Sequence, residues 1–128
     1  VFIAIALSLA EAKEAEAIYL GINAVDYSGY PDCRPEFIES FELTANLGTK
    51  AGVSRNVFKV HAPLIDKKKS EIIRLGLELG VDFSYTSSCY QAGEDGKPCL
   101  KCDSCQIRLK GFSELGIEDP LIKKYKLY

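Results

Sequence analysis

The strongest structural signal in the sequence is the stretch Ala17-Ile18-Tyr19-Leu20-Gly21-Ile22, an apolar run that is followed directly by turn-forming residues. A short apolar run bounded by such residues is typical of a buried strand in a parallel sheet. A second run of this kind, Asn56-Val57-Phe58-Lys59-Val60-His61-Ala62, is closed by Pro63. The sequence therefore predicts two buried strands.

Helical patterns alternate with these two strands, at residues 1–15, 36–48 and 70–80. Helix, strand, helix, strand, helix is the order of βαβ units, so we expect an α/β fold with a parallel sheet. Two strands are too few for such a sheet, which is normally covered on both faces. We therefore expect an incomplete sheet, with further strands before Val1 or pairing with another chain.

The last third of the sequence is different in character. Residues 81–105 are irregular, and we expect a short helix over 106–112 and a final helical turn from Pro120. We interpret 1–80 as the C-terminal part of a nucleotide-binding α/β domain and 81–128 as a C-terminal metal-binding region, the two forming one structural unit.

The composition is that of an ordinary globular domain, with 128 residues, 47% hydrophobic and 27% charged. A formal net charge of −2 provides no global attraction to phosphate backbones or anionic membranes. The sequence holds no Met and opens in helical character, so we interpret it as a piece of a longer protein. Its apolar start lacks the basic residues of a signal peptide, and no stretch approaches the roughly 20 apolar residues of a membrane span. We expect a cytoplasmic protein.

Four of the five cysteines are clustered in the sequence: Cys89, Cys99, Cys102 and Cys105. Gaps of two residues let consecutive thiolates converge on one ion, and zinc is the usual partner of four cysteine sulfurs. We expect one structural Zn²⁺ per chain, which orders the polar loop 90–98 and has no open position for catalysis. Three alternatives stay open from spacing alone: an iron–sulfur cluster, disulfides and unliganded cysteines.

Residues 23–37 follow the first strand and are dense in functional groups. In open α/β sheets, ligands bind at the carboxyl ends of the strands, where this loop begins. Its aspartates can bind a cation or the edge of a base, its tyrosines can flank a planar ring, and its arginine offers a planar fork to a carboxylate or phosphate. The candidate residues are Asp26, Tyr27, Tyr30, Asp32 and Arg34. The alternative is a plain turn in which Asp32 caps the next helix.

Three other residues have reactive or charged side chains, but their positions in the sequence favour structural roles. We expect Cys33 to be a small buried thiol rather than a nucleophile, and His61 to be a packed, hydrogen-bonded core residue. We expect Lys69 to belong to a solvated run of lysines, the alternative being a lysine that faces a phosphate.

Two long motifs resemble those of the 7-cyano-7-deazaguanine synthase family of queuosine biosynthesis. The first is Gly21-Ile22-Asn23-Ala24-Val25-Asp26-Tyr27-Ser28-Gly29-Tyr30-Pro31-Asp32-Cys33-Arg34-Pro35-Glu36-Phe37-Ile38. The second is Thr86-Ser87-Ser88-Cys89-Tyr90 followed by Pro98-Cys99-Leu100-Lys101-Cys102-Asp103-Ser104-Cys105-Gln106-Ile107-Arg108. The segment Tyr30-Pro31-Asp32 is also similar to a loop of GMP synthetase.

The resemblance implies an ATP-dependent carbon–nitrogen ligase that converts 7-carboxy-7-deazaguanine and ammonia to the nitrile preQ0, for tRNA modification. It implies a Rossmann-like sheet of the ATP pyrophosphatase (adenine nucleotide alpha hydrolase-like) type, with a zinc-binding C-terminal region. The implied zinc ligands are Cys89, Cys99, Cys102 and Cys105, and ATP is a co-substrate with Mg²⁺. The implied binding residues for the deazaguanine acid are Asp26, Tyr27, Tyr30, Asp32 and Arg34, with Arg34 at its carboxylate.

We also expect a homodimer with no direct contact to membrane or nucleic acid. The family's phosphate-binding motif, Ser-Gly-Gly-x-Asp-Ser, does not occur in the sequence, so we expect it upstream of Val1 and expect the fragment alone to be inactive.

Two other functions remain open at this point. A zinc-stabilised RNA-binding module is favoured by lysines around residues 97–110 and 123–126, and is opposed by the net acidity. A related ATP pyrophosphatase that modifies tRNA is the other, although such enzymes rely on different cysteine arrangements.

Overall fold

The protein, described by a computed structural model over residues 1–25, 29–55 and 58–127, divides into two compact units. The first unit spans Val1–Asp66 and the second spans Lys67–Tyr128. The elements of the first unit are α1 (Phe2–Ala12), β1 (Ala17–Tyr19), the 3₁₀ turn η1 (Pro31–Cys33), α2 (Pro35–Gly48), α3 (Lys50–Arg55) and β2 (Lys59–His61). Those of the second are α4 (Lys69–Glu78), the 3₁₀ turn η2 (Phe83–Tyr85), α5 (Asp103–Glu114) and α6 (Pro120–Tyr125).

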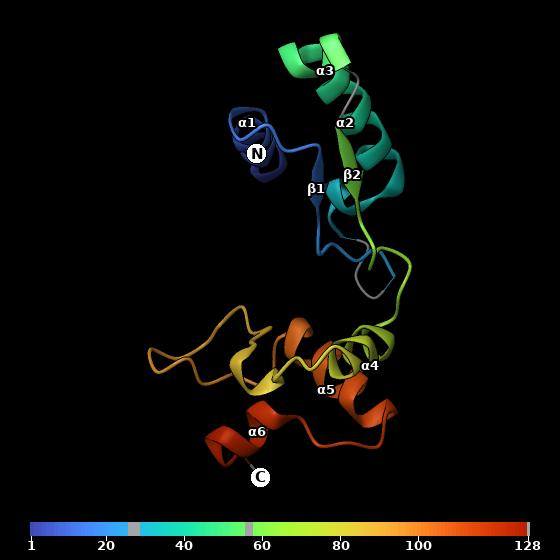
Figure 1. Cartoon of the computed structure of the whole chain (residues 1–128). Helices are drawn as coiled ribbons and strands as arrows, with labels where there is room; N and C mark the ends of the chain where they lie inside the picture. Colours follow the sequence, from blue (N-terminus) through green and yellow to red (C-terminus); the bar gives the residue numbers. More distant parts are fainter. Residues whose placement is uncertain (26–28, 56–57, 128) are drawn as a thin grey trace. The chain divides into compact units, whose positions relative to one another are not determined.

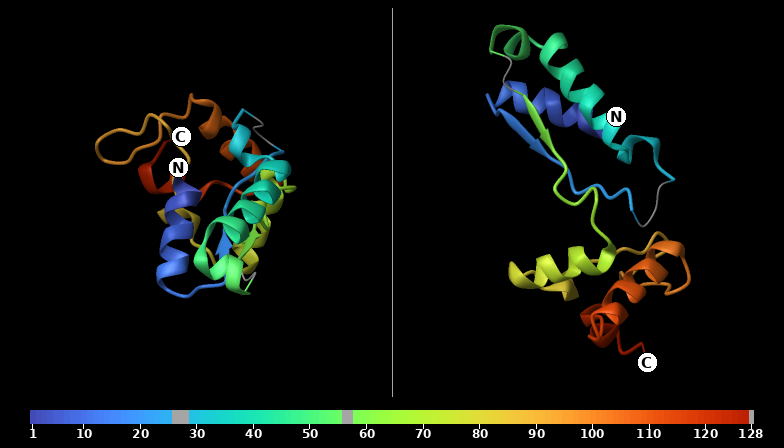
Figure 2. Two further views of the ribbon diagram at one scale, coloured as in Figure 1. Left: turned by 90° about the horizontal axis from the view of Figure 1, so that it is seen from above. Right: turned by 90° about the vertical axis from the view of Figure 1, so that its right-hand side faces the viewer.

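The first unit is built on a two-stranded parallel sheet. β1 and β2 run side by side in Figures 1 and 2, with Ile18 opposite Val60. The parallel pairing confirms the predicted α/β arrangement in its coarse form, a small parallel sheet with helices. Both strands are shorter than the apolar runs that predicted them, and residues 56 and 57 of the second run lie outside the described residues.

One face of this sheet is covered and the other is open. Ile18 and Phe58 are buried on the covered face together with Ala10 of α1 and Ala45 of α2. On the opposite face Tyr19 is 71% exposed, because no described element packs over it. Among the described residues, helices therefore cover only one face of this sheet.

His61 lies on the open face, which contradicts the prediction of a core histidine. Its ring is exposed and stacks on the ring of Tyr19, with centroids 4.6 Å apart. The prediction was wrong because it assumed that both faces of the strand would be covered.

The second unit is held together by the packing of α4 against α5. A Cβ atom added to Gly111 of α5 would lie 2.7 Å from Cγ of Lys69 and 2.9 Å from Cδ1 of Ile73, so a glycine is what lets these helices approach. The fully buried Ile73 and Phe112 fill the interface, and Phe83 packs edge-on against Phe112 with centroids 5.5 Å apart. The Lys69 side chain thus lies beside a neighbouring helix.

The division between the two compact units falls after Asp66. Helix α4 belongs with α5 in the second unit, because its buried residues face α5. The assignment of a nucleotide-binding part and a metal-binding part stays a prediction.

No helix among the described residues is both long and apolar enough to cross a membrane.

Candidate metal centre and ligand-binding loop

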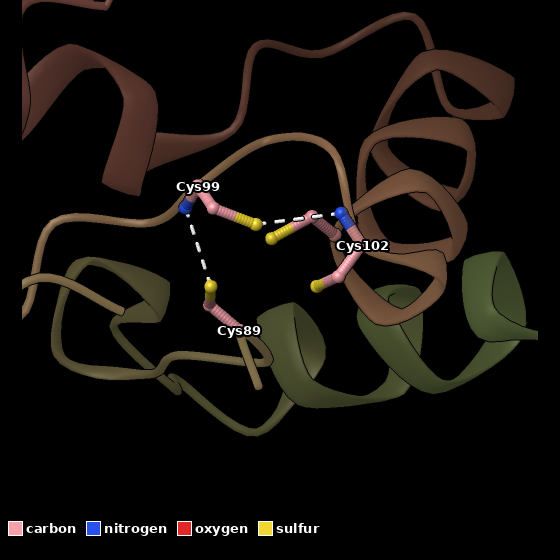
Figure 3. Close-up of side chains that lie close together, drawn as sticks. Cys89, Cys99 and Cys102 are labelled. Carbon is pink, nitrogen blue, oxygen red and sulfur yellow. Dashed lines mark hydrogen bonds between the residues drawn. The ribbon is translucent and has the colours of Figure 1, made fainter. Parts of the chain in front are cut away.

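The fold brings together the four cysteines that the spacing singled out. The sulfur atoms all lie within 4.8 Å of one another, and they belong to Cys89, Cys99, Cys102 and Cys105. In Figure 3 the side chains of Cys89, Cys99 and Cys102 point toward the same small space. A tetrahedral ion about 2.3 Å from each sulfur requires sulfurs about 3.8 Å apart, so small movements of these side chains suffice to hold one ion.

A tight turn places two of the ligands. In the segment Cys99-Leu100-Lys101-Cys102, Leu100 adopts a φ of 60°, in the left-handed region that few residues other than glycine occupy. That turn directs the backbone N–H groups of Lys101 and Cys102 at the Cys99 sulfur, at 3.4 and 3.3 Å. Backbone donors of this kind stabilise a thiolate, so the turn prepares Cys99 to bind a cation.

Backbone N–H groups also donate to the sulfur of Cys89. Its sulfur accepts hydrogen bonds from the backbone N–H groups of Cys99, at 3.2 Å, and Gln91, at 3.3 Å. The first of these joins two segments ten residues apart, and Figure 3 shows it as a dashed line. The hairpin of the polar loop is therefore closed at the cysteines themselves.

Hydrogen bonding and burial move the pKa values of the four thiols in opposite directions. Backbone N–H donors lower the pKa of Cys89, Cys99 and Cys102 below the ordinary thiol value. Burial, followed by its hydrogen bond with Cys102, raises the pKa of Cys105 to about 12. A bound cation would displace the proton of this buried thiol, so metal binding and deprotonation of Cys105 are coupled.

The geometry also bears on the alternatives to a single ion. All five cysteines of the chain, which all lie among the described residues, are free thiols, so the structure holds no disulfide there. An iron–sulfur cluster distributes its cysteine ligands over several iron atoms and spreads them further apart than one ion does. The close grouping of the sulfurs favours a single structural metal ion.

Arg108 has a structural role that sequence reasoning missed. Its guanidinium forms a two-pronged ion pair with Asp119, with Nε 2.6 Å from Oδ2 and Nη2 2.8 Å from Oδ1. The two side chains are only 7% and 2% exposed. In the sequence Arg108 stands out only as the last residue of the second motif, and nothing there indicates that Asp119 pairs with it.

The polar loop 90–98 is fixed by its own hydrogen bonds and by one distant contact. The Gly93 N–H donates to the Lys97 carbonyl at 3.0 Å, and the Lys97 N–H donates to the Asp95 carboxylate at 3.0 Å. The hydroxyl of Tyr125 on α6 donates to the Asp95 carbonyl at 2.8 Å. The C-terminal helix thus anchors the tip of the loop.

The candidate ligand-binding loop begins where β1 ends. The Ala24 N–H donates to the Ile65 carbonyl at 3.0 Å, and the Asn23 amide donates to the Leu64 carbonyl at 3.2 Å. These bonds join the loops that leave the carboxyl ends of β1 and β2. The loop therefore lies at the edge of the sheet where α/β proteins bind ligands.

The predicted binding residues of this loop are only partly described. Asp26 and Tyr27 lie outside the described residues. Tyr30, Asp32 and Arg34 are exposed around η1, and the Arg34 Nε donates to the Pro31 carbonyl at 3.2 Å. Arg34, not Asp32, is the N-cap residue of α2, and the Arg34 side chain makes no capping hydrogen bond.

Cys33 is half-buried at the end of η1. Burial, together with the neighbouring Asp32 carboxylate, raises the pKa of its thiol. A raised pKa disfavours the nucleophilic thiolate, in agreement with the expected structural role.

The sequence was compared with known proteins. Residues 1–116 match the family model described as "Queuosine biosynthesis protein QueC". The chain is 58% identical over 120 residues to a 7-cyano-7-deazaguanine synthase of Pseudomonas fluorescens, covering 94% of this chain and 52% of the relative. It is 56% identical over 127 residues to that of Citrifermentans bemidjiense, covering 99% of this chain and 56% of the relative. The chain thus spans about half the length of the curated relatives it matches.

Proposed function

Since the chain belongs to the QueC family of queuosine biosynthesis proteins, we propose that it is part of an ATP-dependent 7-cyano-7-deazaguanine synthase. The observation that carries this proposal is the 58% identity over 120 residues to a relative of that name. The compared region, 120 of the 128 residues, includes both the cysteine cluster and the ligand-binding loop. It favours a ligase over an RNA-binding module or a tRNA-modifying pyrophosphatase.

The proposed reaction replaces a poor leaving group by a good one. The carboxylate of 7-carboxy-7-deazaguanine resists ammonia because it is anionic and because its oxygen departs badly. Attack of that carboxylate on ATP gives an acyl adenylate and pyrophosphate, and ammonia then displaces AMP to give an amide. The amide oxygen then attacks a second ATP with release of pyrophosphate, and that oxygen leaves with AMP, while the nitrogen loses its two protons, to give the nitrile. Catalysis of this type depends on positioning and on stabilising phosphate charge, with Mg²⁺ accompanying ATP.

The ligand-binding loop is the proposed site for the deazaguanine acid, through Asp26, Tyr27, Tyr30, Asp32 and Arg34. Its position at the carboxyl edge of the sheet supports this assignment, as does the exposure of Tyr30, Asp32 and Arg34. We propose that Arg34 binds the carboxylate, since a guanidinium matches that group with two parallel hydrogen bonds.

The four clustered cysteines are the proposed ligands of one Zn²⁺. Four sulfurs within 4.8 Å, with backbone N–H donors to Cys89, Cys99 and Cys102, fit a closed structural site. The ion would contribute folding energy and no chemistry, because no ligand position remains for water.

The complete fold is proposed to be a Rossmann-like sheet of the ATP pyrophosphatase type, acting as a homodimer in the cytoplasm. The presence of only two parallel strands supports a larger sheet. The open face of the sheet and the exposed apolar residues of α1 support further elements that pack over them. The remaining length of the relatives is the proposed source of the missing strands and of the ATP phosphate site. The 128 residues by themselves are accordingly proposed to be inactive.

The function is tested in a full-length protein that carries this sequence. Incubation with the carboxylic acid, ATP, Mg²⁺ and ammonia should give the nitrile, detected by mass spectrometry, and pyrophosphate. Release of pyrophosphate without nitrile, or no consumption of the acid, would refute the proposed reaction.

The binding role of Arg34 is tested by Arg34→Ala in that full-length protein. We expect KM for the acid to rise by roughly tenfold or more, because a charge-assisted pair is lost. The matched control is Arg55→Ala, which removes an exposed arginine at the end of α3 in the same unit. An unchanged KM in Arg34→Ala removes Arg34 from the site.

A further inference from the structure

We propose that the buried Arg108–Asp119 pair positions the metal centre, by holding the segment that carries Cys89 against the helix that carries Cys105. The proposal rests on the proposed metal site and goes beyond it, since neither residue is a ligand. It predicts that the pair controls how tightly and in what geometry the ion is held.

The guanidinium of Arg108 is fully used within the protein. Besides its two bonds to Asp119, Nη1 donates to the Thr86 carbonyl at 3.1 Å and to the Thr86 hydroxyl at 2.7 Å. Nη2 also donates to the Phe83 carbonyl at 3.0 Å. A guanidinium has five N–H donors, and each of these five hydrogen bonds uses one.

These contacts tie three separate segments together. Arg108 belongs to α5, and Asp119 is the N-cap residue of α6. Phe83 and Thr86 belong to residues 83–89, which begin with η2 and are called the η2 segment below. Asp119 Oδ1 also accepts from the Leu121 N–H at 2.9 Å, so the same carboxylate caps α6. The pair is thus the polar centre of the second unit.

Two of the four cysteines, Cys89 and Cys105, lie next to this centre. Cys105 precedes Arg108 by three residues on α5, which puts the two side chains on one face of the helix, a turn apart. Cys89 follows Thr86 by three residues along the chain. Cys89, Cys105, Arg108 and Asp119 all line one small cavity of about 10 Å³, so little space separates the ion pair from the sulfurs.

Cys99 and Cys102 are positioned differently from Cys89 and Cys105. Cys99 and Cys102 are placed by one local turn, whose hydrogen bonds are made within that turn. The Cys99 N–H also bonds to the Cys89 sulfur, so the turn reaches Cys89 from one side. From the other side, the distance between Cys89 and Cys105 depends on how the η2 segment lies on α5, and Arg108 bonds these two together. A buried ion pair adds little net stability, but it specifies one arrangement because its partners have no alternative.

The test compares Arg108→Lys, Asp119→Asn and Thr86→Val with the wild-type full-length protein, all loaded with zinc. Lysine keeps the charge but loses the planar fork, and valine removes only the hydroxyl that Arg108 uses. We expect zinc release to a chelating dye to be about tenfold faster or more in Arg108→Lys and Asp119→Asn, with a smaller change in the same direction in Thr86→Val. With Co²⁺ in place of zinc, the visible absorption bands should shift, because the tetrahedron is distorted.

The control is whichever of Ile73→Val and Ile73→Ala matches Arg108→Lys in unfolding temperature, since Ile73 is buried in the same unit on α4. We expect the control to release zinc at the wild-type rate and to keep the wild-type Co²⁺ spectrum. Equal acceleration in the control, or wild-type rates and spectra in the folded variants, overturns the proposal. If Arg108→Lys and Asp119→Asn do not fold, Thr86→Val decides. A wild-type protein that binds no ion refutes the metal centre itself.

Discussion

The thiols of Cys33 and Cys102 lie in opposite environments. Cys102 lies among sulfurs and backbone N–H donors that lower its thiol pKa, whereas burial raises the pKa of Cys33. We therefore expect Cys102→Ser to lose stoichiometric zinc and to destabilise the second unit by at least about 2 kcal/mol. Cys33→Ser is the matched control and should keep full metal content by elemental analysis. Equal metal content in the two variants would contradict the ligand assignment.

Glu42 offers a pH-dependent prediction in the first unit. Its carboxylate accepts the Val60 N–H at 2.8 Å and pairs with Lys59 at 3.0 Å, and these contacts lower its pKa. A depressed pKa means that the ionised form stabilises the fold at neutral pH, and that this contribution is lost as the pH falls through the folded-state pKa. We expect Glu42→Gln to lower stability by about 1 kcal/mol at neutral pH and to speed amide exchange at Val60.

The stability of the same two proteins is also compared at acidic pH. Below the pKa of Glu42 the wild-type protein and Glu42→Gln should become equally stable, since both side chains are then neutral. A difference in stability that does not shrink on acidification would show that charge has no part in this contact. Glu39→Gln, at an exposed position of the same helix, is the control.

Residue spacing predicted the cysteine cluster because its ligands are close in the chain and their turn geometry is local. It did not predict the Arg108 network, because Asp119 and Thr86 lie 11 and 22 residues away and nothing in the pattern pairs them. The core role expected for His61 failed for a related reason, since whether a strand face is covered depends on other segments.

At the scale of elements, α2 was predicted well because Pro35 and Gly48 mark its two ends. Helix α1 ends three residues earlier than expected, at Ala12, where the Ala15 N–H bonds back to the Ala10 carbonyl and Glu14 takes a φ of 56°. No glycine marks this left-handed end, so the sequence carried no signal for it.

Helix α3 was missed altogether, although Thr49 gave a usable sign of it. The Thr49 hydroxyl accepts the Gly52 N–H at 2.9 Å, in the way that a threonine caps the start of a helix. Six residues are too few for a periodic pattern to stand out, which is why the cap was the available signal.

The junction of α2 and α3 allows a matched glycine test. A Cβ atom at Gly52 would lie 2.5 Å from the Asn46 Cα and 2.6 Å from the Ala45 carbonyl oxygen, both of them backbone atoms that cannot rotate away. At Gly48 a Cβ atom would meet nothing within 4 Å. We expect Gly52→Ala to destabilise the first unit by about 1–3 kcal/mol, and Gly48→Ala to be neutral or slightly stabilising, both measured by chemical denaturation. Similar effects in the two variants would contradict the close packing of α3 on α2.

At the scale of the whole molecule, the division into two units predicts that metal removal acts locally. The four cysteines all lie in Lys67–Tyr128, and none of them lies in Val1–Asp66. We expect a chelator to speed hydrogen exchange across residues 86–105 and α5, while β1 and β2 keep their exchange rates. Loss of protection in both units together would show that the ion stabilises a single cooperative structure instead.

The exposed apolar surface of α1 leads to a prediction in which one substitution has opposite effects in two contexts. Phe2, Ile5 and Leu9 are 87%, 62% and 59% exposed, while the opposite side of α1 packs on the core through Ala10. A helix that is apolar all round is normally a buried helix, and the chain matches only about half the length of its relatives.

We expect Ile5→Lys with Leu9→Lys to reduce aggregation of the 128-residue chain, because it breaks an exposed apolar patch. In the full-length protein the same pair should lower the unfolding temperature and the rate of nitrile formation, because charge would be buried against the remaining half. Ser40→Lys, at an exposed polar position of α2, should change neither. If the lysine pair changes neither property of the full-length protein, the surface of α1 stays exposed to solvent there. The remaining half would then pack on another part of this chain.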